Sequence, residues 1–549
     1  MSDILLPLLV TIPIMLAAFP LLAGLKYERA GWPIAMLGSL VVAGMAALLT
    51  WEVYLEGQAT GDQIIHELGG FPAPRGIELV GDSLSALIAL LIGVVSVAVL
   101  IYARESGPQG NAFYSGYLLL TGGLLGVAFT GDLFNLFVFL EIVGLVTYAL
   151  IAADRSGKAA YGALKYLFLG TIGASLYLIG VGYAFVATGT LNMLDLQSAL
   201  AEVGYTDPLV QAAFGFILVG FMLKIALFPL HTWQPDAYTY APDSVSAYIS
   251  ALVSTTAAYA LIRISFDVFT VDFFAANPLI ADGVVLLASI SIVVGSLLAV
   301  MQTEIKRIFA YSSVAQFGMI VAAIGLTSET ALFGAVIHLV GHGLMKAALF
   351  MGAGIMATAY GARTISQYGG LAKRAPFTSG SIAITGLALV GIPPSIGFVG
   401  KWFIALGAVQ EGSWGLAVVI FVSTMLTLLY VARIIEKLYF DPPGDPHGAA
   451  HDDHGDGHDD AVDGHAVADG GHAGDDGGLT TDTQTDGGSP AETPIKPGDS
   501  PEQTAAVSGA VSREMLAVVL TLTLATVALF VSADQFAAML DPVFGRFFQ

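Results

Sequence analysis

Six ionisable side chains lie inside long apolar stretches of this sequence. One of them is the single glutamate of GDLFNLFVFLEIVGLVTYALIAAD, residues 131–154. Charged groups placed in hydrocarbon cost several kcal/mol each, and they usually mark a functional path. A carboxylate, imidazoles and amines are together the groups that bind and release protons. The six residues are Glu141, Lys224, His338, His342, Lys346 and Lys401.

Three of these residues form a row. In AVIHLVGHGLMKAALFM, His338, His342 and Lys346 are spaced four residues apart, which places them on one face of an α-helix. Imidazole accepts and donates protons near neutral pH, so the row could pass a proton. A zinc site is the alternative, but it needs more ligands, and the HExxH glutamate is missing. We favour a proton relay and expect neither a metal nor a cofactor.

The other two lysines lie beside prolines. Lys224 precedes two prolines in FMLKIALFPLHTWQPDAY, and Lys401 follows GIPPSIG. Proline interrupts a helix, and non-helical backbone at membrane depth is tolerated only inside protein or along a wet cavity. We interpret Glu141 as the partner of a buried cation, with Lys224 as the preferred one. Separating such a pair would favour release of the lysine proton.

Three further charged residues lie nearer the ends of their apolar runs. Lys165 could be an interfacial anchor whose ammonium reaches the membrane surface, or it could be functional, and both interpretations stay open. Asp82 and Asp132 lie near the outer ends of their predicted helices. We expect these two carboxylates to face water.

The composition indicates a polytopic membrane protein. Of the 549 residues, 56% are hydrophobic and 12% charged, whereas soluble domains average ~25% charged. The apolar runs are each long enough to cross about 30 Å of hydrocarbon. The first run is too long for a signal peptide and lacks its basic flank, so we expect it to be retained. We predict about 14 spans, at 4–25, 32–51, 79–103, 112–130, 133–153, 161–187, 209–228, 243–265, 279–301, 306–326, 330–357, 380–406, 413–437 and 513–533.

The loops between these spans differ in charge. One set of alternate loops carries most of the lysine and arginine, and the other carries little beyond Arg75, with Arg263 at a helix end. By the positive-inside rule the basic set is cytoplasmic, and an even number of spans puts both termini outside the cell (plasma) membrane. The basic set contains Lys26, Arg29, Arg104, Arg155, Lys158, Lys306, Arg307, Arg363, Lys373, Arg374, Arg433 and Lys437.

The net charge of −22 is concentrated in one segment. Residues 441–510 hold 16 Asp and Glu against one lysine, a charge of −15, which leaves −7 for the remaining chain. We predict that 441–512 is an acidic, His/Asp-rich, disordered cytoplasmic insertion. Its six histidines could instead bind a metal, but no spacing repeats. The chain has no cysteine, so disulfides and thiolate metal sites are excluded.

The spans form two sets of five after three N-terminal spans, and the broken spans 7 and 12 are each the fourth of their set. Paired broken helices are typical of transporters with inverted repeats. We predict an all-α polytopic membrane protein with two inverted five-helix repeats and broken helices 7 and 12. The predicted domains are 1–111 with three spans, 112–265 and 279–440 with one repeat each, the insertion 441–512, and the C-terminal span in 513–549.

Over residues 75–440 the chain resembles the antiporter-like subunits shared by Mrp cation/proton antiporters, respiratory complex I and membrane-bound hydrogenases. The resemblance rests on four segments: TGDLFNLFVFLEI around Glu141, PLHTWQPDAYTYAPDSVSAY after Lys224, the H-x3-H-x3-K row, and the segment that ends in Lys401. The segment around Glu141 is most similar to the D subunit of Mrp antiporters.

The resemblance implies a role for each residue of a proton pathway. It makes the carboxylate–lysine pair the inlet, the row of three residues the central relay, and the last lysine the outlet. Family members usually carry a lysine or histidine in the eighth span, where this chain has Thr255 in SALVSTTAAYALIR. Water held by Ser254, Thr255 and Thr256 would then have to bridge the gap. The implied pathway is Glu141, Lys224, Thr255, His338, His342, Lys346 and Lys401.

The resemblance implies a function as the proton-conducting subunit of a multisubunit Na+/H+ antiporter, which is not itself an enzyme. Its partners would be other membrane subunits, protons, Na+ and the lipid bilayer, without nucleic acid. One alternative is a proton-pumping subunit of a complex I-like or hydrogenase-type redox complex. The chain carries no cysteine, haem motif or nucleotide loop, so redox chemistry would lie in its partners. A non-conducting scaffold subunit is the alternative of another class.

Overall fold

The structure, a computed structural model, describes residues 2–60, 63–108, 110–442 and 511–548. Most of the predicted insertion 441–512 therefore lies outside the described residues, and its predicted disorder stays a prediction.

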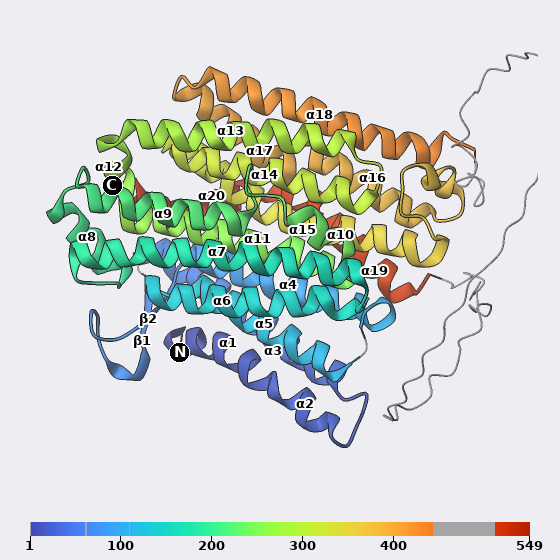
Figure 1. The fold of residues 1–549 in the computed structure, drawn as a ribbon, viewed down its shortest axis with the longest axis horizontal. Helices are drawn as coiled ribbons and strands as arrows, with labels where there is room; N and C mark the ends of the chain where they lie inside the picture. Colours follow the sequence, from blue (N-terminus) through green and yellow to red (C-terminus); the bar gives the residue numbers. More distant parts are fainter. Residues whose placement is uncertain (1, 61–62, 109, 443–510, 549) are drawn as a thin grey trace, which may run out of the picture. The chain divides into compact units, whose positions relative to one another are not determined.

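Membrane-spanning helices make up most of the described chain. Thirteen described helices are long and apolar enough to cross a membrane, and the twelfth predicted span consists of two shorter apolar helices. The predicted all-α polytopic class is confirmed, and the spans lie side by side (Figure 1). The helices of the first half are α1 (Ser2–Leu16), α2 (Ala18–Gly24), α3 (Gly31–Thr60), α4 (Ser83–Ser106), α5 (Asn111–Phe129), α6 (Leu133–Ile151), α7 (Gly157–Thr188), α8 (Met193–Val203), α9 (Pro208–Ile225), α10 (Gln234–Tyr240) and α11 (Asp243–Arg263). Those of the second half are α12 (Thr270–Ala276), α13 (Pro278–Met301), α14 (Ile305–Leu326), α15 (Glu329–Tyr360), α16 (Pro376–Val390), α17 (Ile396–Gln410), α18 (Trp414–Tyr439), α19 (Arg513–Ala528) and α20 (Ala533–Phe547).

A short hairpin departs from the all-α prediction. Strand β1 (Ile64–Glu67) pairs antiparallel with β2 (Glu78–Gly81), with Ile64 opposite Gly81. Strands of four residues are too short for hydrophobic periodicity to identify them. The hairpin lies at the end of the helix bundle where α1 begins and α20 ends (Figure 1).

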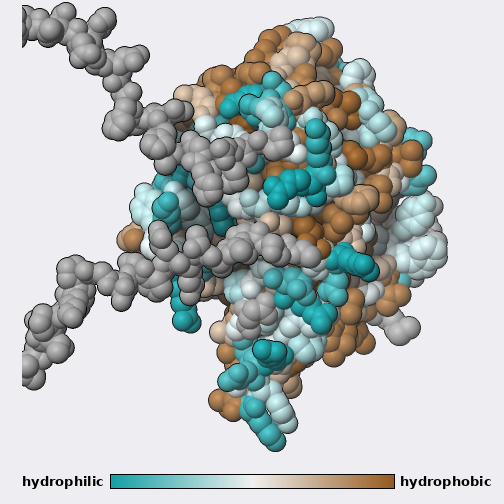
Figure 2. Space-filling view, turned by 90° about the vertical axis from the view of Figure 1, so that its right-hand side faces the viewer, coloured by the Kyte–Doolittle hydropathy of each residue, from teal (hydrophilic) through white to brown (hydrophobic). Residues whose placement is uncertain are grey.

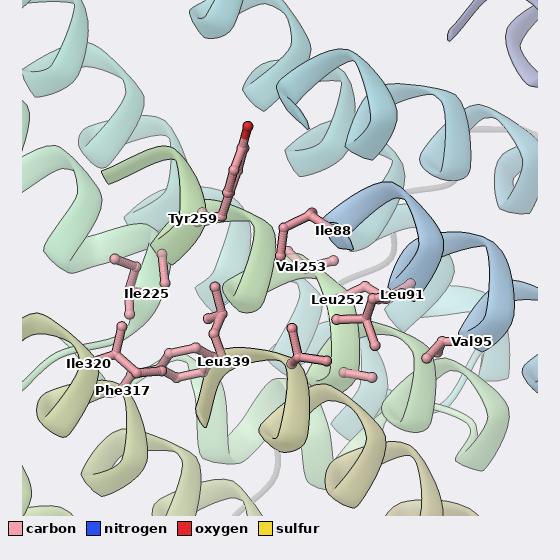
Figure 3. Packing of buried hydrophobic residues seen from close by; sticks show 14 of the residues in the cluster. Ile88, Leu91, Val95, Ile225, Leu252, Val253, Tyr259, Phe317, Ile320 and Leu339 are labelled. Carbon is pink, nitrogen blue, oxygen red and sulfur yellow. The ribbon is translucent and has the colours of Figure 1, made fainter. Parts of the chain in front are cut away.

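Helix α11 lies at the centre of the bundle. Every side chain from Ser244 to Arg263 is buried, and α11 packs against α4, α5, α9 and α15. In Figure 3, Leu252 and Val253 of α11 lie beside Ile88 and Leu91 of α4. By contrast, only about a third of the α7 span is buried, and the buried share of the α18 span is the same. The side chains of α11 are therefore in contact with protein, whereas α7 and α18 present a broad apolar face to their surroundings.

The helical interruptions lie where the prolines predict them. Helix α9 ends at Ile225, Ala226 adopts a left-handed conformation with φ 63°, and α10 begins at Gln234. Helix α16 ends at Val390, Gly391 has φ 93°, and α17 begins at Ile396. A positive φ turns the chain out of the helix at each point. The inverted relation between the two sets of five spans stays a prediction, as do the domain boundaries.

Polar residues gather at the bundle end where the α4–α5 and α6–α7 loops lie. Figure 2 shows hydrophilic residues over this end and hydrophobic residues along the flanks. The basic residues of the positive-inside argument border these loops, as Arg104 does in the last turn of α4 and Lys158 in the first turn of α7. The distribution is that of a bundle whose sides contact lipid or partner subunits.

Four charged residues form a network at the hairpin end, which corrects one expectation. Asp82 does not face water: it is 4% exposed, caps α4 by accepting from the Ser85 amide, and lies 2.5 Å from an Arg263 nitrogen. Arg263 also contacts Asp267 at 2.8 Å. Arg546 of α20 contacts both carboxylates, at 2.7 Å and 3.3 Å. Burial alone would raise the pKa of the Asp82 carboxyl, but Arg263 and Arg546 outweigh it and hold this pKa well below its usual range.

This network predicts a difference between two arginine substitutions. Arg263→Met should leave two buried carboxylates with a single counter-charge and cost about 3–5 kcal/mol, the usual effect of breaking a buried ion pair. Arg546→Met should cost less, because the Arg546 side chain is 26% exposed and water can replace it. Thermal unfolding of the purified protein in detergent measures both losses. An equal loss in the two variants would contradict the burial argument.

Candidate functional site

The predicted carboxylate–lysine pair is present. Glu141 lies midway along α6, and its Oε1 is 3.3 Å from Nζ of Lys224, in the last turn of α9. The Lys224 side chain is 9% exposed. Gly144 follows Glu141 by one turn, and a Cβ there would lie 3.4 Å from the ammonium. The absent side chain therefore leaves room for Lys224 to reach the carboxylate.

The break after Lys224 supplies further polar groups. Helix α9 ends one residue later, and the Trp233 indole donates to the Leu223 carbonyl at 2.8 Å. The carbonyl end of a helix favours a cation, so the helix terminus adds to the carboxylate in stabilising the ammonium. The proline break thus positions the lysine as well as interrupting the span.

The predicted row of three residues lies on α15 and is completely buried. His338, His342 and Lys346 are each 0% exposed. His338 Nε2 is 2.8 Å from Gln316 Oε1. Both ring nitrogens of His342 lack a hydrogen-bond partner in the part of the chain that the structure describes. Buried polar atoms without protein partners are the places where internal water binds.

Lys346 is held by neighbouring α14. Its ammonium donates to the Phe309 carbonyl at 2.7 Å and to the Ser312 hydroxyl. No carboxylate pairs with it among the described residues. Lys346 is thus an amine in a site of neutral acceptors, which can bind a proton or release it without breaking an ion pair.

Lys401 closes the break between α16 and α17. Its Nζ donates to the carbonyls of Leu389 and Val390, at 2.8 Å and 3.2 Å, in the last turn of α16. The neighbouring Gly400 brings α17 against α15, since a Cβ there would lie 2.6 Å from the His338 Cβ. Small residues permit such close helix approach in membranes. Lys401 therefore directly follows, in sequence, the residue of α17 that packs against His338.

The eighth span has hydroxyl groups where relatives are expected to have a cation. Thr255 and Thr256 are buried, and their hydroxyl oxygens have no partner within the described residues. Ser254 lies 3.2 Å from the Tyr238 hydroxyl. Among the described side chains, Lys224 bonds Glu141 and no member of the row on α15. The water bridge at Thr255 stays a prediction.

Two polar residues around this site, Asp236 and Gln316, were not singled out from the sequence. Lys165 does not simply reach the surface: its ammonium is 2.7 Å from Asp236, which also binds Arg307 at 2.8 Å. Asp236 could have been found, because it directly follows the proline break in WQPDAY. Gln316 could not, because a neutral amide in an apolar helix carries no spacing signal. Asp132 is partly exposed and caps α6 through the Asn135 amide.

A cavity of about 630 Å³ opens near the basic loops. Its walls include Asp243 at the start of α11 and Lys306 at the start of α14, which pair at 2.9 Å. This volume is many times the space that a single water molecule needs. The cavity lies at Asp243, the first residue of α11, and Thr255 follows twelve residues later in the same helix.

The sequence matches a known family over most of these elements. Residues 130–427 match the family described as NADH:quinone oxidoreductase/Mrp antiporter, TM. The chain is 40% identical over 440 residues to the N subunit of the NADH-quinone oxidoreductase of Desulforudis audaxviator, covering 78% of this chain and 86% of the relative. It is 32% identical over 376 residues to the D subunit of the Na(+)/H(+) antiporter of Bacillus subtilis, covering 68% and 75%.

Two solved structures have the same fold. A chain of the Mrp complex from Dietzia sp. superposes with a TM-score of 0.82 at 25% identity, covering 100% of this chain and 98% of that one. A chain of the membrane-bound sulfane sulfur reductase, an archaeal respiratory membrane complex, gives a TM-score of 0.80 at 28% identity, covering 99% and 98%. Both belong to multisubunit membrane complexes.

The unpartnered hydroxyl of Thr255 predicts a functional effect without a folding defect. Thr255→Val keeps the side-chain shape but removes the group that would hold a bridging water. We expect roughly ten-fold slower proton transfer, about 1.4 kcal/mol of barrier, with unchanged amounts of protein in the membrane. Proton flux in vesicles measures it. The control is Thr526→Val in α19, where the hydroxyl bonds a carbonyl of its own helix; equal losses in both variants would contradict the water bridge.

Proposed function

Because the chain belongs to the NADH:quinone oxidoreductase/Mrp antiporter membrane family, we propose that it is the proton-conducting subunit of a multisubunit Na+/H+ antiporter. The observation that carries the proposal is the Glu141–Lys224 ion pair in the middle of an apolar span. An ion pair at this depth has a large desolvation cost, and packing alone would be served by apolar residues. The similarity to the D subunit of a Na(+)/H(+) antiporter supports the choice of complex.

In the proposed pathway, protons pass along a line of bases at membrane depth. The carboxylate of Glu141 stabilises protonated Lys224, and separating the two groups weakens the hold of the amine on its proton. Thr255 and bound water hand the proton to the row on α15. Lys401 receives it last, and loses it when its ammonium leaves the α16 carbonyls.

A second candidate has a specific observation in its favour. The more similar of the two relatives is an NADH-quinone oxidoreductase subunit. In a redox-driven complex this chain would use the same residues, and the electron carriers would lie in partner subunits. Purification of the native complex separates the two: iron–sulfur subunits would favour the redox complex, and small membrane subunits alone would favour the antiporter.

The scaffold alternative explains less. It is supported only by the uncharged residue Thr255 in the eighth span, at the position where the family is expected to carry a cation. A scaffold would gain nothing from the buried lysines at positions 224, 346 and 401, each of which is desolvated. We therefore retain conduction as the proposed role.

The ion pair predicts the effect of removing one charge. Glu141→Gln keeps the size of the side chain but removes the counter-charge of Lys224. We expect normal assembly and at least a roughly ten-fold loss of cation/proton exchange. Removing the counter-charge changes the free energy of proton binding at Lys224, and about 1.4 kcal/mol corresponds to a ten-fold change in that equilibrium. Moving one charge through a membrane potential of 100 mV changes its free energy by only ~2.3 kcal/mol. The change in proton binding at Lys224 would therefore be comparable to the free energy that drives the proton across the membrane. Proton flux in everted vesicles containing the whole complex measures it.

The matched control is Glu436→Gln, which neutralises an exposed carboxylate of α18 and should leave exchange unchanged. Lys401→Ala should abolish exchange from the other end of the pathway. Near-normal exchange in Glu141→Gln would show that the carboxylate is structural.

The basic loops predict the orientation of the protein in the cell membrane. We propose that residues 441–512 face the cytoplasm and that both termini face outward, because the loops at the insertion end carry the lysine and arginine. A protease added to sealed right-side-out vesicles should leave the insertion intact and cut it after the vesicles are opened. Cleavage in sealed vesicles would show that the insertion faces outward and that the proposed topology is wrong.

A further inference from the structure

Helix α16 carries buried hydroxyl groups from its first turn towards the break between α16 and α17. Ser379 is 0% exposed, Ser381 2% and Thr385 0%. Lys373 and Arg374, just before the start of the helix, are exposed. The first of these hydroxyls therefore lies close to the end of the bundle that carries the basic loops, which we call the basic end.

The hydroxyls lie on a line that leads to Lys401. Ser381, Thr385 and Leu389 are spaced four residues apart, which places them on one face of α16. Ser381 and Leu389 are about 12 Å apart along the helix axis. The Leu389 carbonyl accepts the hydrogen bond from the Lys401 ammonium at 2.8 Å. The line therefore joins the basic end of the bundle to the last base of the proposed pathway.

Two of these hydroxyls have no partner of their own. The side-chain oxygens of Ser379 and Ser381 make no hydrogen bond within the part of the chain that the structure describes. Buried hydroxyls of neighbouring helices donate to a carbonyl one turn back, as Thr427 of α18 and Thr523 of α19 do at 2.8 Å. Contact between helices explains the Thr385 hydroxyl, which lies 3.1 Å from that of Thr523. It does not explain the two serines, and buried polar atoms of this kind are where internal water binds.

The line contains no charged group. Helix α16 reads PFTSGSIAITGLALV and has neither an acidic nor a basic side chain. A hydroxyl both donates and accepts hydrogen bonds, so a row of hydroxyls can hold water in a chain without fixing a charge. The chemistry available along α16 is therefore that of ordered water, whereas the row on α15 is made of bases.

We propose that Ser379, Ser381 and Thr385 hold a chain of water molecules that connects Lys401 with the basic end of the bundle. This inference rests on the proposed proton conduction, and it supplies the opening through which the last base of the pathway reaches solution. The Lys401 ammonium gives one proton to the nearest water, and each oxygen along the line accepts one proton and donates another. With the proposed orientation of the protein, the outlet opens to the cytoplasm.

The access of silver ions to single cysteines tests the water chain. Because the sequence has no cysteine, Ser381→Cys introduces a unique thiol of nearly the same size into this subunit. Ag+ binds thiolates, which are soft ligands, and it travels through water. Everted vesicles that contain the whole complex are treated with Ag+. The free thiols of this subunit are then counted after the complex is unfolded and its subunits are separated.

The matched control for the silver experiment is Ser296→Cys in α13. Ser296 is also 0% exposed, but its hydroxyl bonds that of Ser423 at 2.7 Å. We expect the thiol at position 381 to be lost at least roughly ten-fold faster than the thiol at position 296, equivalent to about 1.4 kcal/mol of barrier. Equal rates at the two positions, or a faster loss in right-side-out than in everted vesicles, would overturn the inference.

Removal of one unpartnered hydroxyl tests the function of the water chain. Ser381→Ala breaks no hydrogen bond to the described residues, so it should not lower the thermal stability. We nevertheless expect cation/proton exchange to be roughly ten-fold slower, with normal amounts of protein in the membrane. The control Ser296→Ala loses hydrogen bonds at 2.7 Å and 2.8 Å and should leave exchange unchanged.

The outcomes separate this inference from the proposed function. Normal exchange in Ser381→Ala, together with the expected loss in Glu141→Gln, would refute the water chain alone. The silver experiment does not depend on exchange, so it tests the water chain even if Glu141→Gln shows that the carboxylate is structural.

Discussion

The low dielectric constant of the membrane interior governs this structure, because every charge placed there requires a nearby partner. The chain meets the requirement in three ways. Lys224 pairs with a carboxylate, Lys346 donates to a carbonyl and a hydroxyl, and Lys401 donates to the carbonyls at a helix end. The three arrangements differ chemically, since neutral acceptors let an amine lose its proton without stranding an anion. Of these three lysines, Lys224 alone has a partner whose own charge can change.

Glycine and proline create the geometry that these partners need. Proline frees the carbonyls that Lys401 uses, and Gly400 lets α17 approach α15 closely enough to bring that lysine beside His338. Gly144 leaves the space that Lys224 occupies. The positions of the ionisable groups therefore depend on glycine and proline residues, whose side chains cannot bind protons. Substitution of these glycines would displace charges without altering any of them.

Hydropathy and proline placement were enough to predict the spans and the breaks, because both reflect the chain's own composition. The pair Glu141–Lys224 was also predictable, since an isolated buried carboxylate has few candidate cations. The Asp82 network was not. Asp82 lies at the edge of an apolar run, where water and a buried arginine are equally possible, and Arg546 is more than 460 residues away in sequence. Such contacts depend on tertiary packing, which no local pattern encodes.

The position of Arg546 has a consequence for biosynthesis. Asp82 and Asp267 together carry two negative charges, and Arg263 neutralises one of them. The second is neutralised by Arg546 of α20, which follows Asp267 by 279 residues. Until α20 has been synthesised and has packed against α4, the hairpin end of the bundle holds an uncompensated carboxylate beside the central helix. A chain without α20 would therefore differ from one with it by a buried, uncompensated charge at the hairpin end of the bundle.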